Sequence, residues 1–169
     1  MSTALFFEEL NVGDTWTSQG RTITESDVVQ FAGMTGDYNP LHVDHDHALQ
    51  TPFRKVIAHG LLGLSWVAGL GSHSPQVRTD AFLGIEQWEF VQPAFIGDTV
   101  HVHTQVVDKE PSGRRRGKVV WFRQLINQRD EVIQKGRFVT LVAFRQPLRQ
   151  RVDEPSKSAG PHVTVGVKE

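Results

Sequence analysis

The 169-residue chain contains no cysteine. A disulfide framework, a zinc site built on thiolates and a cysteine nucleophile are therefore all excluded. Any chemistry carried out by this protein must come from other side chains.

The chain also lacks an excess of charge of either sign. Its 18 lysines and arginines stand against 19 aspartates and glutamates, which leaves a formal net charge of −1 at pH 7. This balance gives no electrostatic reason to expect nucleic acid or an anionic membrane as a partner.

Long hydrophobic runs are absent as well. The most apolar stretch, G60-L-L-G-L-S-W-V-A-G-L70, has only about half of the ~20 residues that span a bilayer. The first residues, M1-S-T-A-L-F-F-E-E-L, lack the basic segment that opens a secretory signal. We therefore expect no membrane partner and a cytoplasmic protein.

A chain of this length can build one domain with a substantial core. The composition, with 38% hydrophobic and 22% charged residues, is typical of a globular protein. After position 146 the sequence is polar and follows neither the helical nor the strand period. We predict a single domain over residues 1–146 and a poorly ordered polar tail over residues 147–169.

Two helices are predicted in the first half of the chain. Thr24 stands three residues before an acidic residue and ahead of apolar residues at helical spacing, which indicates a capped amphipathic helix ending near Gly33 or Gly36. Residues 37–58 are predicted to be mostly loop, with a short helix beginning at Asp44. Residues 59–71 are apolar around most of a helical circumference, which predicts a helix buried on nearly all sides.

The second half changes to the period of a strand. Strand-like runs separated by turn sequences lie at about 82–91, 98–107, 117–127 and 131–145. In the second run the alternation predicts that Val100, Val102 and Val106 share one face. Consecutive strands joined by hairpin-like links indicate an antiparallel sheet. Together these elements predict an α+β domain in which a curved sheet wraps the helix at 59–71, with the helix-loop segment at 24–58 overhanging it.

A carboxylate and an imidazole stand close together in D37-Y-N-P-L-H42. The proline keeps Asn39 out of the helical region, so we expect Asp37 and His42 on a rigid, non-helical connection. Such a pair can converge on one water molecule and exchange protons near neutral pH. The same residues also suit a turn in which Asp37 acts as a cap and His42 lies at the surface, and the spacing alone leaves both interpretations open.

Longer motifs resemble a known family. The run F31-A-G-M-T-G-D-Y-N-P-L-H-V-D, followed by A58-H-G-L-L-G-L-S65, is similar to the MaoC-like dehydratases. V12-G-D-T and P93-A-F-I-G-D-T-V extend the resemblance over most of residues 8–145. The resemblance implies a hot-dog fold and an (R)-specific enoyl-CoA hydratase, which adds water to a trans-2-enoyl-CoA to give the (R)-3-hydroxyacyl-CoA without a cofactor.

The resemblance also implies roles for individual residues. Asp37 and His42 correspond to the pair that acts on water, and Gly60 to the glycine whose backbone N–H polarises the thioester carbonyl. A helix N-terminus suits this task because it offers unpaired N–H donors and a partial positive charge. Ser65 corresponds to a serine that supports the acidic residue, although its hydroxyl could equally bond back to a helix carbonyl. We interpret Asn39 as a residue that holds the loop geometry.

The resemblance further implies an acyl-CoA substrate and a homodimer or dimer-based oligomer. Arg54, Lys55 and Arg114 are candidate contacts to the coenzyme A phosphates, the last of them from a neighbouring subunit. A hot-dog acyl-CoA thioesterase and a non-catalytic acyl-CoA binding module remain alternative functions.

The remaining histidines raise the possibility of a metal site. H42-V-D-H-D-H47 alternates imidazoles with carboxylates, and H101-V-H103 resembles the paired histidines of cupin barrels. The expected glutamate and later histidine of a cupin are missing, so we predict no metal. We expect His45 and His47 to be exposed near the start of a short helix, and His59 to be a structural residue.

Overall fold

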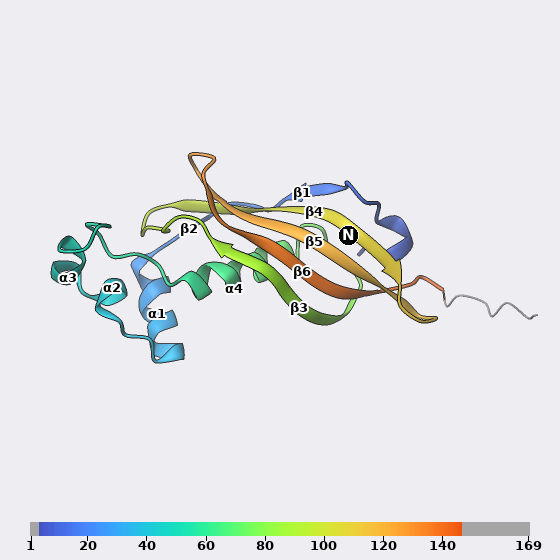
Figure 1. The fold of residues 1–169 in the computed structure, drawn as a ribbon, viewed down its shortest axis with the longest axis horizontal. Coiled ribbons are helices and arrows are strands. Elements are labelled where there is room, and N and C mark those ends of the chain that lie inside the picture. Colours follow the sequence, from blue (N-terminus) through green and yellow to red (C-terminus); the bar gives the residue numbers. More distant parts are fainter. Residues whose placement is uncertain (1–3, 147–169) are drawn as a thin grey trace, which may run out of the picture.

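One antiparallel sheet forms the body of the protein in the computed structural model, which describes residues 4–146 (Figure 1). Its strands are β1 (Thr15–Thr17), β2 (Arg21–Thr22), β3 (Thr79–Phe90), β4 (Thr99–Pro111), β5 (Arg116–Asn127) and β6 (Val132–Ala143). The order is β1-β4-β5-β6-β3, with β2 also paired to β4. The predicted antiparallel sheet and its four long strands are thus confirmed.

The link between β3 and β4 differs from the prediction. β3 pairs with β6 at the sheet edge and not with β4, so residues 91–98 do not form a hairpin turn. They cross between distant strands instead, held by a hydrogen bond from Ala58 N to Ala94 O (2.8 Å) and a bridge between Ile57 and Phe95. This crossing segment thereby lies against the loop that leads into the central helix.

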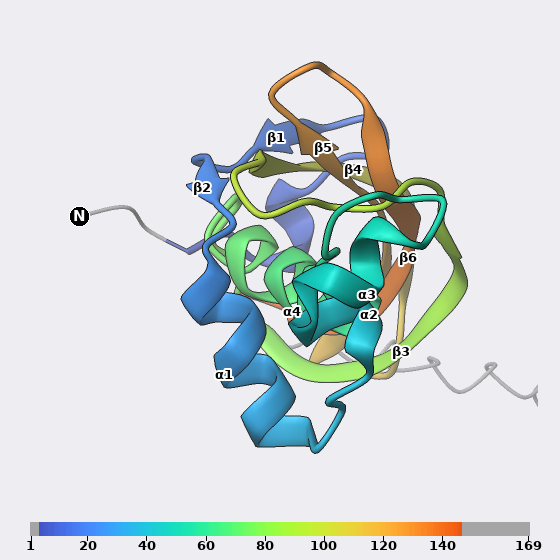
Figure 2. The ribbon, with the colours of Figure 1, turned by 90° about the vertical axis from the view of Figure 1, so that its left-hand side faces the viewer.

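The central helix, α4 (Gly60–Gly71), lies inside the curve of the sheet (Figure 2). Val67 of the helix is fully buried, as are the alternate valines of β4 that were expected on one face (Val100, Val102 and Val106). The prediction that α4 is buried on nearly all sides is wrong for the single chain, because Leu61 is 59% exposed and Ser65 and Ala68 are also exposed. The sheet covers only one side of this apolar helix.

Three short helices overhang the N-terminal end of α4 (Figures 1 and 2). They are α1 (Glu25–Thr35), α2 (Pro40–Val43) and α3 (His45–Leu49). The predicted cap of α1 is present, since Thr24 Oγ1 accepts from the Asp27 N–H at 3.2 Å. The helix ends at Gly36, whose φ of 79° is the left-handed conformation that glycine adopts readily.

A 3₁₀ turn, η1 (Phe7–Glu9), packs at the other end of the sheet, where the Phe7 ring meets the Phe144 ring edge-on at 5.0 Å. No helix within residues 4–146 is long and apolar enough to cross a bilayer. The polar tail predicted over residues 147–169 lies outside the described residues.

Candidate active site

The connection after α1 places the two residues expected to act on water. Asn39 Oδ1 accepts a hydrogen bond from the Leu41 N–H at 3.0 Å, and Pro40 occupies the first helical position. This cap starts α2, so His42 lies on one turn of helix and the expected non-helical connection is wrong for this residue. Proline restricts the residue before it but suits the first position of a helix, where its missing N–H costs nothing.

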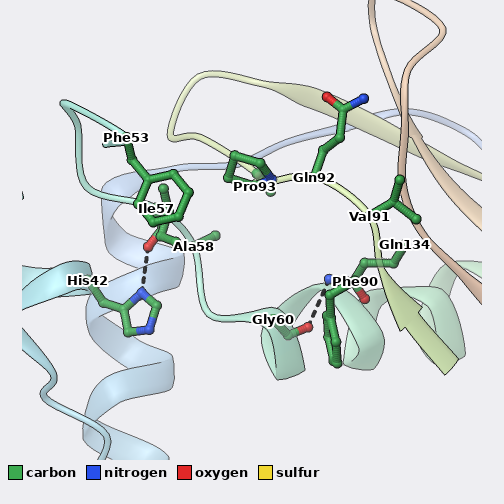
Figure 3. Close-up of a pocket in the computed structure, with 11 residues that line it drawn as sticks. His42, Phe53, Ile57, Ala58, Gly60, Phe90, Val91, Gln92, Pro93 and Gln134 are labelled. Carbon is green, nitrogen blue, oxygen red and sulfur yellow. Dashed lines mark hydrogen bonds between the residues drawn. The ribbon is translucent and has the colours of Figure 1, made fainter. Parts of the chain in front are cut away.

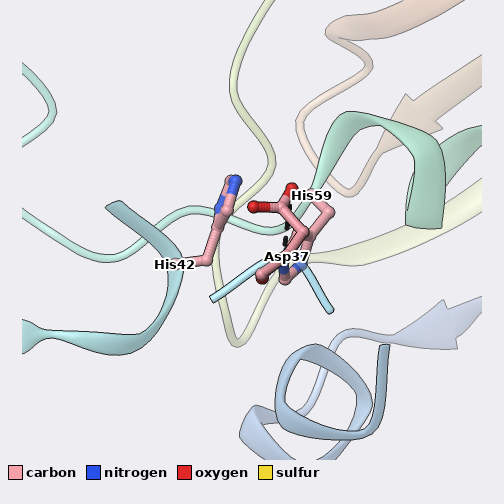
Figure 4. A group of neighbouring side chains, drawn as sticks. All are labelled: Asp37, His42 and His59. Carbon is pink, nitrogen blue, oxygen red and sulfur yellow. Dashed lines mark hydrogen bonds and ion pairs between the residues drawn. The ribbon is translucent and has the colours of Figure 1, made fainter. Parts of the chain in front are cut away.

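Asp37, His42 and His59 form a cluster (Figure 4). The imidazoles of His42 and His59 are stacked, with ring centroids 3.8 Å apart and an interplanar angle of 29°. His59 Nε2 lies 2.9 Å from the backbone oxygen of Asp37 and 4.0 Å from Asp37 Oδ2. The carboxylate of Asp37 is 54% exposed, whereas the side chain of His59 is only 2% exposed. The cluster thus joins a solvent-facing acid to a buried imidazole.

Hydrogen bonds to carbonyl groups define the tautomers of both rings. His42 Nδ1 lies 2.7 Å from the carbonyl oxygen of Ile57 (Figure 3). Because a carbonyl only accepts, Nδ1 carries the hydrogen and Nε2 of the neutral ring keeps a free lone pair. By the same reasoning His59 donates from Nε2 to Asp37 O, and its buried Nδ1 has no partner within residues 4–146. His42 therefore offers a proton acceptor, while His59 holds the backbone of Asp37.

A cavity of about 340 Å³ opens beside this cluster (Figure 3). His42 and Gly60 both line it, and its walls are otherwise mainly apolar: Phe53, Ile57, Ala58, Phe90, Val91, Gln92, Pro93, Ala94 and Gln134. Gly60 is the first residue of α4, so its N–H is among those without an acceptor inside the helix. The cavity therefore presents a proton acceptor and a helix N-terminus to the same volume.

Gln134 of β6 fixes the start of α4 and was not singled out from the sequence. Its side chain is 3% exposed, and its Nε2 donates to Gly60 O at 2.9 Å. Its Oε1 accepts from Trp88 Nε1 at 3.3 Å. A Cβ added to Gly63 would lie 2.3 Å from Gln134 Nε2, so this amide can hold its position only beside a glycine. The signal in the sequence is the spacing of Gln134 and Phe138, which are four residues apart on one strand and therefore point to the same, inward face of the sheet.

The other predicted site residues lie at different distances from the cluster. Ser65 is exposed and its hydroxyl donates to Leu61 O at 2.8 Å, so the structure shows the bond back to the helix. Arg54 and Lys55 line a neighbouring cavity of about 440 Å³. Arg114 lies in the β4–β5 hairpin, at the end of the sheet opposite α1–α3 (Figure 1). Within one chain, Arg114 is therefore not part of this site.

The cluster also has the composition of a possible cation site. Asp37, His42 and His59 each offer one ligand atom, and these atoms all lie within 4.8 Å of one another. Of the histidine-rich string H42-V-D-H-D-H47, only His42 belongs to this cluster. His45 Nε2 instead lies 3.2 Å from Glu25 Oε1. The absence of a metal stays a prediction. Proton transfer needs only the groups already in place.

Comparison with known proteins gives consistent matches. The MaoC like domain family matches residues 10–127. The (R)-specific enoyl-CoA hydratase of Rhodospirillum rubrum is 33% identical over 141 residues, which cover 83% of this chain and 93% of that protein. The 3-hydroxybutyryl-CoA dehydratase of Methylorubrum extorquens is 39% identical over 112 residues, covering 66% and 69%. The structure of an R-hydratase from Pseudomonas aeruginosa superposes with a TM-score of 0.70 at 26% identity, covering 96% of this chain and 97% of that one.

Proposed function

Because this chain belongs to the MaoC-like dehydratase family, whose hydratases and dehydratases act on acyl thioesters, we propose that it adds water reversibly to a trans-2-enoyl-CoA. The product is the (R)-3-hydroxyacyl-CoA. The observation that carries this proposal is the shared cavity, in which the free Nε2 of His42 and the N-terminus of α4 at Gly60 face one volume.

The geometry supports a division of work between these groups. The thioester oxygen takes the position beside the Gly60 N–H, where the helix N-terminus stabilises the negative charge that develops on the enolate. His42 Nε2 accepts a proton from water while the water oxygen bonds to the β-carbon and the double-bond electrons move toward the carbonyl. The α-carbon then takes a proton from the Asp37/His42 pair on the same face, and the carbonyl re-forms. The addition is therefore syn.

Asp37 orients the water through its carboxylate, which lies beside the stacked imidazoles. Asn39 supports this arrangement by capping α2, and His59 supports it by donating to the Asp37 carbonyl. We assign His59 a positioning role, since the only polar contacts of its side chain among residues 4–146 are with Asp37.

The coenzyme A phosphates of the substrate are proposed to lie near Arg54 and Lys55. These two cations line the cavity next to the one that contains His42. Arginine and lysine are suitable phosphate ligands. Arg114 would reach a phosphate only from a neighbouring subunit, given its place at the far end of the sheet (Figure 1).

We also propose a homodimer formed along β3. This strand is a sheet edge within residues 4–146 and carries exposed apolar side chains, including Leu83 (52%) and Ile85 (40%). Leu61 of α4 is also an exposed apolar side chain, at 59%. A long apolar edge strand favours pairing with another chain, and an isologous contact would cover both copies at once. The mass of the protein in solution tests this proposal, which a monomer at micromolar concentration would refute.

Two substitutions test the site. Asp37→Asn and His42→Ala should each lower the turnover of a short trans-2-enoyl-CoA by about 10²–10⁴-fold, the effect of removing a general acid or base. His47→Ala is the matched control, since His47 is an exposed histidine on the adjacent helix α3. Loss of activity only in the first two variants, with unchanged melting temperatures, supports the proposal. Full activity in either of them refutes it, and release of free thiol without hydration would identify a thioesterase.

A further inference from the structure

A second cavity, of about 240 Å³, lies at the C-terminal end of α4. Its walls are largely apolar and aromatic, with contributions from Ala68, Phe82, Trp121 and Phe138. One charged side chain lines it, that of Arg123 on β5. A cation in such a setting needs an explanation, because buried charges are normally paired.

Arg123 is 8% exposed and has no carboxylate within 4.0 Å among residues 4–146. Nη1 donates to Val67 O at 3.3 Å and Nη2 to Gly71 O at 3.2 Å. A guanidinium has five N–H donors, so these two long bonds leave the others, including the buried Nε, without an acceptor among residues 4–146. The C-terminal carbonyls of α4 therefore satisfy this cation only in part.

The surroundings hold the guanidinium in place at the cavity wall. Its carbon atom lies 4.8 Å from the centre of the Phe138 ring. A Cβ added to Gly71 would lie 2.7 Å from Nη1, so the guanidinium packs directly against the helix backbone at this glycine. Burial lowers the pKa of Arg123 to about 10, which still leaves the side chain protonated at neutral pH. A fixed positive charge thus faces a largely apolar space.

Thr140 supplies a second polar group to the same cavity. Its Oγ1 accepts a hydrogen bond from Trp121 Nε1 at 2.9 Å. The hydroxyl hydrogen of Thr140 is therefore free to donate to another acceptor. Together, Thr140 and Arg123 offer donors and a positive charge but no anion, which is the complement of a carboxylate.

We propose that this cavity binds a carboxylate at the far end of the substrate's acyl group, an inference that rests on the proposed hydration at His42 and Gly60. Both cavities border α4, and the eight steps along the helix from Gly60 to Ala68 correspond to about 12 Å along the helix axis. An extended chain advances about 3.5 Å for every three bonds, so an acyl chain of roughly ten bonds spans this length. The preferred substrate is then a medium-length enoyl thioester that ends in a carboxylate instead of a methyl group.

Direct binding to the wild-type protein tests this inference without requiring turnover. Saturated acyl-CoAs of equal length, one ending in methyl and one in carboxylate, are titrated by calorimetry. The carboxylate-ended ligand should bind at least roughly tenfold more tightly, the effect of one charged hydrogen bond. Equal binding, or tighter binding of the methyl-ended ligand, overturns the inference.

Two variants then assign the preference to residues. Arg123→Met should abolish the preference for the carboxylate-ended ligand over the methyl-ended one, and Thr140→Val should weaken it. A preference that survives in a folded Arg123→Met protein overturns the role of Arg123. Since Arg123 also contacts the end of α4, the wild-type comparison decides the matter if this variant does not fold.

The enoyl forms of the same two ligands separate this inference from the proposed function. Hydration of both at equal kcat/KM leaves the proposed function intact and refutes the carboxylate site. Selective binding of the carboxylate-ended ligand without hydration of either ligand refutes the proposed hydratase function and supports the carboxylate site at Arg123.

Discussion

Replacing Gly63 of α4 by alanine tests whether Gln134 holds the start of the central helix in position. The added Cβ would lie 2.3 Å from Gln134 Nε2 and 3.1 Å from its Cδ, inside contact distance of a side chain that is 3% exposed. Gln134 would have to move, and its 2.9 Å hydrogen bond to Gly60 O would be lost or distorted. The substitution thus acts on the helix N-terminus that we propose to bind the thioester oxygen.

The size of the effect follows from opposing contributions. Overpacking a buried site costs about 1–3 kcal/mol, and a lost hydrogen bond costs about 0.5–1.5 kcal/mol. Alanine is a better helix former than glycine by about 1 kcal/mol, which opposes these costs. We expect a net destabilisation of about 2 kcal/mol for Gly63→Ala, which corresponds to a melting temperature lower by about 4–8 °C in a domain of this size.

Gly69→Ala is the matched control on the same helix. A Cβ at Gly69 has no neighbour within 4 Å among the described residues, so only the gain in helix propensity remains and stability should rise by up to about 1 kcal/mol. Both variants are compared with the wild type by thermal unfolding at equal protein concentration, together with kcat/KM on one enoyl-CoA. If Gly63→Ala melts as high as Gly69→Ala and turns over substrate as fast, Gln134 does not fix the helix start.

Three further predictions concern the cluster, the sheet edge and acid stability. His59→Ala should lower kcat more than it changes KM. His59→Gln should restore part of the lost kcat, because the glutamine amide can donate to Asp37 O. Equal kcat in the wild type and both variants would rule out a positioning role. Leu83→Asp should halve the mass measured by light scattering while leaving the fold intact, and an unchanged mass would exclude the β3 interface. Burial raises the pKa of Asp98, but hydrogen bonds from Gln128 and its neighbours outweigh this effect and leave the pKa below its ordinary value of 3.8. Because the folded-state pKa is depressed, this stabilisation is present above that value and is lost as the pH falls through the folded-state pKa. Asp98→Asn should therefore flatten the fall in melting temperature as the pH drops below 3.8, and an unchanged slope would contradict this.

Local signals in the sequence were enough to predict the capped start of α1 at Thr24, the central helix and the inward valines of β4. The sequence patterns do not predict the short helix α2, because the start of this helix depends on the Asn39 side chain, which accepts from the Leu41 N–H. The proline after Asn39 indicates only that Asn39 itself avoids the helical conformation. The crossing at residues 91–98 was also missed, since a strand order cannot be obtained from turn sequences alone.

The site residues divide in the same way. The resemblance selected Asp37 and His42, but the contact of His59 with both of them arises only when the loop before α4 folds against the end of α1. Gln134 and Arg123 were recognisable in principle, because each is a polar residue at an inward position of an alternating strand. What the alternation could not indicate is their partner, which in both cases is a backbone carbonyl of α4.

The most direct test of the central claim is the reaction of the wild-type protein with a crotonyl-type trans-2-enoyl-CoA, followed by the absorbance of the conjugated thioester and by chiral analysis of the product. Hydration at this site should give loss of this absorbance, formation of the (R)-3-hydroxyacyl-CoA and no release of free coenzyme A. A product that is purely (S), or free thiol with the double bond intact, would contradict hydration at Asp37 and His42.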